Sequence, residues 1–183
     1  MVQCLDLSLN FLHHQKMSVI IQAIPPQIKE LNLSHNYCED YGIVHLAERL
    51  KTNFSLSSLN LQENKIRDIK LLADSLSLSG HTGSLRYLNL TNNNFDFSHE
   101  ADIEAFSTFL KGCTNLQVLR LHKMTKQESK VAQDEESTNL SEAIVSALVQ
   151  SESRRTLRAI EMDLPTEMTW KASERFDACM PQL

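Results

Sequence analysis

The chain repeats one arrangement of leucine and polar positions. The segment LRYLNLTNNNF places leucines at Leu85, Leu88 and Leu90 and an asparagine at Asn93, which is neither a helical period nor a clean strand alternation. Related segments begin at Val2, Ile28, Leu56, Leu116 and Leu157. The six starts lie 26, 28, 29, 31 and 41 residues apart. Self-similarity at such a period indicates a solenoid of stacked repeats.

The central leucines of each copy predict a short strand, because residues two apart point to the same face of a sheet. The clearest strands are expected at 4–8, 30–34, 58–62 and 87–91. An asparagine follows each of these strands, and its amide can satisfy turn backbone groups that would otherwise be buried without partners. Stacked copies predict an asparagine ladder of Asn10, Asn36, Asn64 and Asn93.

Amphipathic helical segments alternate with the strands. They are expected at 17–24, 42–52, 69–78, 101–113 and 140–150. This alternation predicts parallel strands with right-handed crossovers. Strands pack about 4.8 Å apart and helices roughly 10 Å apart, so the stack should curve. The predicted fold class is an α/β horseshoe with the strands on the concave face and the helices on the convex face.

The register of three leucines and an asparagine resembles that of leucine-rich repeat proteins of the ribonuclease-inhibitor-like class, whose repeats have about 28–29 residues and a full helix each. Four copies keep this register. The resemblance implies a binding scaffold. Such repeats occur in intracellular inhibitors, immune-receptor sensor domains, GTPase-activating proteins and bacterial effectors delivered into host cells.

The chain departs from the regular repeat in three places. It opens inside the first copy, so the core flank beside Val2, Leu5 and Leu7 has no cap. An uncovered strand edge predicts self-association, or a longer natural chain. The fifth copy lacks the asparagine and is followed by a polar insertion at 125–139, expected to be a mobile loop. Repeats are therefore assigned to 1–164, and 165–183 is expected to form a C-terminal capping helix.

Composition narrows the function classes. The formal net charge of −5 gives no support for nucleic-acid binding. No apolar run reaches the roughly eighteen residues of a membrane span, and the N-terminus does not resemble a signal peptide. The four cysteines lie far apart, which favours free thiols in a cytoplasmic compartment, including a host cytoplasm for a secreted bacterial effector.

Enzyme signatures are absent from the sequence. It has no glycine-rich phosphate loop, no GxSxG and no HExxH. His13 and His14 are adjacent and diverge on any regular element, so a solvated pair is favoured over a metal site. Cys4 has no histidine near it in sequence, which argues against a nucleophile. No catalytic, metal or cofactor residue is assigned.

The polar positions of the strands remain as the displayed surface. Around the fourth and fifth copies they become basic and aromatic, and such residues dominate interface energetics. The candidate partner-binding residues are Arg86, Tyr87, Asn89, Arg120, His122 and Lys123. If these do not bind, the 125–139 insertion or Trp170 is the next candidate.

The sequence thus predicts a non-enzymatic scaffold that binds a protein partner on its concave face, with no cofactor, nucleic acid or membrane. Two alternatives remain open. One is a GTPase-activating or other regulatory activity, although no residue can be carried over from that branch. The other is a fragment or sensor module of a larger receptor.

Overall fold

The computed structural model describes residues 2–51, 56–78, 80–95, 97, 99–122 and 133–162. Within these residues, six strands form one parallel sheet in sequence order. They are β1 (Cys4–Asp6), β2 (Glu30–Asn32), β3 (Ser58–Asn60), β4 (Tyr87–Asn89), β5 (Val118–Leu121) and β6 (Ala159–Met162). The predicted parallel pairing is confirmed for all five neighbouring pairs.

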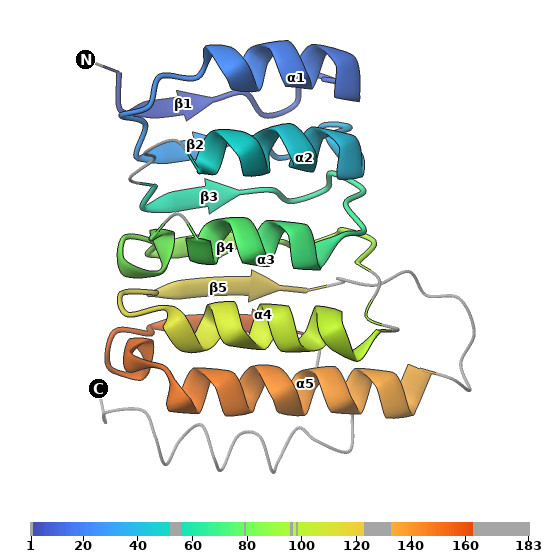
Figure 1. Cartoon of the computed structure of the whole chain (residues 1–183), viewed down its shortest axis with the longest axis vertical. Coiled ribbons are helices and arrows are strands. Elements are labelled where there is room, and N and C mark those ends of the chain that lie inside the picture. The colour runs from blue at the N-terminus through green and yellow to red at the C-terminus, as the bar shows by residue number, and fades with distance from the viewer. Residues whose placement is uncertain are drawn as a thin grey trace.

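A helix follows each of the first five strands. They are α1 (His14–Ala23), α2 (Glu39–Leu50), α3 (Ile69–Leu78), α4 (Glu100–Gly112) and α5 (Gln133–Gln150). Short 3-10 helices at His81–Gly83 (η1) and Glu152–Arg155 (η2) precede β4 and β6. The five helices lie on one side of the sheet, and the strands stack along the long axis of the molecule (Figure 1). This arrangement fits a leucine-rich-repeat-like fold, whereas the expected horseshoe curvature stays a prediction.

The helix boundaries correct the sequence-based ones at three places. Helix α1 begins at His14 rather than at residue 17. Helix α2 begins at Glu39 rather than at residue 42, because Glu39 and Asp40 occupy its first turn, where carboxylates complement the helix dipole. Helix α5 begins at Gln133, so the expectation of a loop over 125–139 is wrong for 133–139. That polar stretch contains residues with good helix propensity, and it extends the amphipathic helix. Residues 125–132 lie outside the described residues, as does the proposed cap at 165–183.

The repeated leucines form one core with the apolar stripes of the helices. Leu31, Leu59, Leu88 and Leu119, at one position of successive strands, are at most 1% exposed. Burial of such a side chain stabilises the fold by about 1.5–3 kcal/mol. Leu5, at the same position in β1, is only partly buried, because among the described residues no strand lies beyond β1.

An asparagine ladder joins the turns that follow the strands. The side chains of Asn36, Asn64 and Asn93 are at most 3% exposed. Each amide bonds backbone groups of its own turn and of the preceding repeat; for example, Asn64 Nδ2 donates to Leu61 O and Leu33 O. The side-chain carbonyl oxygen also bonds the preceding repeat: Asn64 Oδ1 accepts from the Cys38 backbone N–H.

Asn10 does not extend this ladder. It is exposed, and its Nδ2 donates to Ser8 O of its own turn. No earlier turn lies within reach among the described residues, so the asparagine of the first repeat has no neighbour to join. Its backbone N–H still donates to Asn36 Oδ1, which ties the first turn to the second.

Candidate functional site

The sheet face opposite the helices, here the helix-free face, carries the polar residues of every strand. The strand pairs share one unshifted register, so Tyr87 lies beside Ser58 and Val118, and Asn89 lies beside Arg120. In the same way, Arg120 of β5 lies beside Glu161 of β6. Residues far apart in sequence therefore form straight rows across the sheet.

Arg120 is the centre of a charged cluster on this face. Its Nε lies 3.1 Å from Glu161 Oε2, and its guanidinium carbon lies 5.9 Å from the centre of the Tyr87 ring. Its Nη1 donates to the Tyr87 hydroxyl oxygen over 3.5 Å. Strands β4, β5 and β6 thus each contribute one member of this group.

The ion pair between Arg120 and Glu161 is loose. The Arg120 Nε is enclosed by the protein, yet its N–H finds no hydrogen-bond acceptor with acceptable geometry among the described residues. The 3.1 Å contact with Glu161 is therefore an ion pair by distance and not a hydrogen bond. The two side chains are 40% and 55% exposed, and a pair this open contributes about 0–1 kcal/mol.

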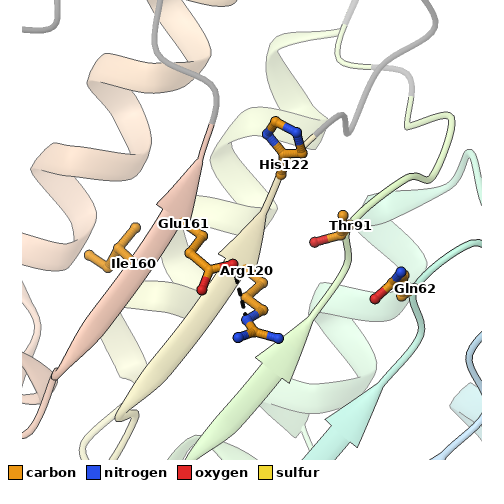
Figure 2. Close-up of a pocket in the computed structure, with 6 residues that line it drawn as sticks. All are labelled: Gln62, Thr91, Arg120, His122, Ile160 and Glu161. Atoms are coloured by element: carbon orange, nitrogen blue, oxygen red, sulfur yellow. Dashed lines mark ion pairs between the residues drawn. The ribbon is translucent and has the colours of Figure 1, made fainter.

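A shallow pocket of about 420 Å³ lies on this face near the carboxyl ends of the strands. Its lining residues are Gln62, Thr91, Arg120, His122, Ile160 and Glu161. Figure 2 shows Arg120 and Glu161 from adjacent strands, with Thr91 and Gln62 on the opposite side and His122 just beyond the end of β5. The volume suits one or two side chains of a ligand.

Hydrogen bonds between side chains of neighbouring repeats fix the side of the pocket nearest β3. Gln62 Oε1 accepts from Asn89 Nδ2 over 3.1 Å, and Gln62 Nε2 lies 3.3 Å from His35 Nε2. His35 Nδ1 in turn lies 2.9 Å from Glu63 Oε2. Burial alone would raise the pKa of Glu63, but the hydrogen bond from Asn92 and the nearby His35 lower it below its usual value. This edge of the pocket is therefore preorganised.

The structure brings together only some of the partner-binding residues that the sequence predicts. Tyr87, Arg120 and His122 lie together on the helix-free face. Asn89 is only 1% exposed, so its inclusion as a contact residue is wrong: its amide is taken by Gln62, and it supports the surface. Arg86 is exposed but precedes β4, at the end of the strand away from the pocket. Lys123 lies outside the described residues.

Sequence reasoning left four pocket residues out of the candidate set: Gln62, Thr91, Ile160 and Glu161. Three of them occupy polar positions of the strand motif, so the parallel register would have placed Glu161 beside Arg120. Ile160 stands where β2 to β5 carry a buried leucine, and the pattern gave no sign that it would line a pocket.

His13, His14 and Cys4 form no chemical site with the other described residues. His13 stacks on Tyr37 with ring centres 5.0 Å apart, and the neighbouring His14 begins α1. The described residues contain no group of three side chains able to hold a metal ion. A hydrogen bond with Glu30 raises the pKa of Cys4, which makes its thiol less nucleophilic. Trp170 lies outside the described part of the chain.

None of the helices in the described part of the chain combines the length and the apolar composition needed to cross a membrane. Comparison with curated proteins gives no match to this chain. Residues 84–108, which contain β4 and most of α4, match the family model described as Leucine Rich Repeat. That match, together with the repeated strand–helix units, supports a leucine-rich repeat protein and hence a protein-interaction module.

Proposed function

We propose that this chain is a non-enzymatic scaffold that binds a protein partner on its helix-free face, over β4, β5 and β6. The observation that carries this proposal is the association of Arg120 and Tyr87 beside an open pocket. Arginine and tyrosine are enriched among the residues that carry most of the energy of protein interfaces. We also assign the repeats to the ribonuclease-inhibitor-like class, since a helix follows each of the first five strands.

The sheet supports such binding energetically. Tyr87 and Arg120 stand on strands whose alternate residues, Leu88 and Leu119, are fully buried. Side chains on a packed sheet lose little freedom when a partner docks, so less of the interaction energy is spent on ordering. The Arg120 guanidinium favours a partner surface with an acidic group, with association rates that fall as salt rises.

The test is affinity capture from cell lysate, followed by titration of the captured partner against four purified variants. Tyr87→Ala and Arg120→Ala should each weaken binding by about 1–3 kcal/mol, which is roughly fivefold to 150-fold. Tyr41→Ala and Lys51→Ala are matched controls, because both residues are exposed at α2 on the helical side. They should leave the affinity unchanged.

Circular dichroism spectra of all four variants check that the fold is kept. Equal affinities for the four variants would move the binding site off the helix-free face. Weakening by Tyr41→Ala alone would place the partner on the helices.

We also propose that a second copy of the chain covers the first repeat. Val2, Leu9, Phe11 and Val19 are each 58–68% exposed, so apolar side chains gather around β1 and α1. Such a surface next to a free strand edge favours association. Sedimentation velocity should detect dimers that Phe11→Ser weakens. A strict monomer at high concentration would contradict this.

We propose a cytoplasmic location, which includes the host cytoplasm for a bacterial effector. The supporting observation is that Cys4, Cys38 and Cys113 are free thiols in the described part of the chain. Free thiols are typical of reducing compartments. Localisation of a fluorescently tagged chain tests this proposal.

A further inference from the structure

We propose that the pocket at Arg120 binds a carboxylate of the partner protein, and that this carboxylate displaces Glu161 from Arg120. This inference rests on the proposed function and specifies the chemistry that the partner must supply. It follows from the hydrogen-bond donors that Arg120 leaves unused and from the looseness of its ion pair.

Arg120 has more hydrogen-bond donors than the described residues use. A guanidinium carries five N–H donors in a planar fork. Among the described residues, only Nη1 makes a hydrogen bond, a long one of 3.5 Å to the Tyr87 hydroxyl. The Nε is enclosed without a hydrogen bond, and an enclosed donor without a partner is costly. A carboxylate that meets two N–H groups side by side would satisfy this fork, in the geometry that such pairs prefer.

Glu161 offers a carboxylate to Arg120 without that geometry. Its Oε2 lies 3.1 Å from Nε, but the N–H does not point at it. Glu161 is 55% exposed, so water can solvate it as soon as it leaves Arg120. Exchange of one carboxylate for another keeps the charge around Arg120 constant, so the displacement leaves no unpaired buried charge.

The surroundings of Arg120 favour a carboxylate over a more highly charged anion. Among the described residues that line the pocket, Arg120 is the one permanently charged cation. One guanidinium matches the single charge of a carboxylate, whereas phosphate groups are typically bound by clusters of arginines. Tyr87 of β4 and Glu161 of β6 both contact Arg120, which stands on the strand between them, so the ligand approaches from the open pocket.

The experiment uses blocked amino acids as probes and nuclear magnetic resonance as the readout. The protein is titrated with glutamate blocked as N-acetyl and C-methylamide, and with identically blocked glutamine, which has the same shape and no charge. N-acetylglutamine with a free terminal carboxylate separates a chain terminus from an acidic side chain. The signals followed are the Nε–H of Arg120 and the backbone amide of Thr91, which lines the opposite side of the pocket.

The wild type should show saturable shifts with blocked glutamate, with the free terminal carboxylate, or with both, and none with blocked glutamine. Glu161→Gln removes the competing carboxylate and should tighten binding by up to about fivefold, the upper end of the range expected for an exposed ion pair. Arg120→Gln should abolish the saturable shift of Thr91. Glu48→Gln is the matched control, because Glu48 forms a similar exposed ion pair with Lys51 on the helical side. It should bind like the wild type.

Equal responses to glutamate and glutamine probes would overturn the inference, as would an affinity that Glu161→Gln leaves unchanged or weakens. These failures are distinct from a failure of the proposed function. If a captured partner still depends on Tyr87 and Arg120 while no carboxylate probe binds, the helix-free face is the binding site and the carboxylate inference is wrong.

Discussion

Replacement of the central ladder residue, Asn64→Ala, tests whether the asparagines hold the repeats together. Asn64 is fully buried, and its amide makes four hydrogen bonds to backbone groups of its own turn and of the preceding repeat. The substitution removes all four and leaves a small cavity. The cost depends on which backbone groups then have no other partner.

These backbone groups differ in whether they keep another hydrogen-bond partner. The three carbonyls that accept from Asn64 keep a second donor: Leu33 O keeps Asn36 Nδ2, Leu61 O keeps Asn93 Nδ2, and Gln62 O keeps the His35 N–H. The Cys38 N–H donates to Asn64 Oδ1 and makes no other hydrogen bond among the described residues. One buried donor without a partner costs about 1–3 kcal/mol. The free energy of unfolding of Asn64→Ala should fall by that amount.

Urea denaturation followed by circular dichroism measures this loss, provided the slope of the transition is unchanged. Asn10→Ala is the matched control, because Asn10 has the same place in the first repeat but is exposed and bonds only Ser8 O with its amide nitrogen. It should change the stability by less than about 0.5 kcal/mol. A loss below about 0.5 kcal/mol for Asn64→Ala, or equal losses for both variants, would refute the ladder argument.

Three further outcomes are expected. Burial lowers the pKa of His81, so its proton uptake favours the unfolded state. The contribution of His81 to the free energy of unfolding is therefore complete above about pH 6.5, and it decreases as the pH falls from there through the lower pKa of the folded state. Urea titrations of His81→Asn at several pH values should lack this pH-dependent contribution. Cys38 is buried, and burial raises its pKa to about 12, so a maleimide at neutral pH should modify Cys4 but not Cys38, as read by mass spectrometry of the peptides. Gly42→Ala should lose about 1–3 kcal/mol in thermal unfolding, because the new Cβ would lie 2.5 Å from the Cys38 Sγ; Gly112→Ala, with its nearest contact at 3.3 Å on the surface, should change little.

The sequence predicted the sheet well because periodicity carries the relevant information. Leucines two apart can share one face only if the segment is extended, and their repetition at a constant register leaves parallel stacking as the way to bury them. The same logic failed where no periodicity exists. The segment 133–139 is polar throughout, so nothing in its pattern distinguished a loop from the first turns of α5.

The candidate site was harder to predict, because exposure depends on the neighbouring side chain. Asn89 and Arg120 occupy the same position of adjacent strands, yet Asn89 is covered and Arg120 is open. Gln62 contributes to this difference, because its own amide bonds the Asn89 side chain. A row can be derived from the repeat period, but which of its members reaches solvent depends on side-chain packing that the period does not encode.

The unshifted register of the sheet places the side chains of the helix-free face at regular intervals. From β1 to β6 each row holds one side chain per strand at a step of about 4.8 Å, so a full row spans roughly 24 Å. The position of a side chain on this face is set by counting repeats, and the backbone that carries it is the same in each. A substitution in one repeat therefore changes one side chain of a row and leaves the positions of the others unchanged. Binding specificity can thus change one repeat at a time.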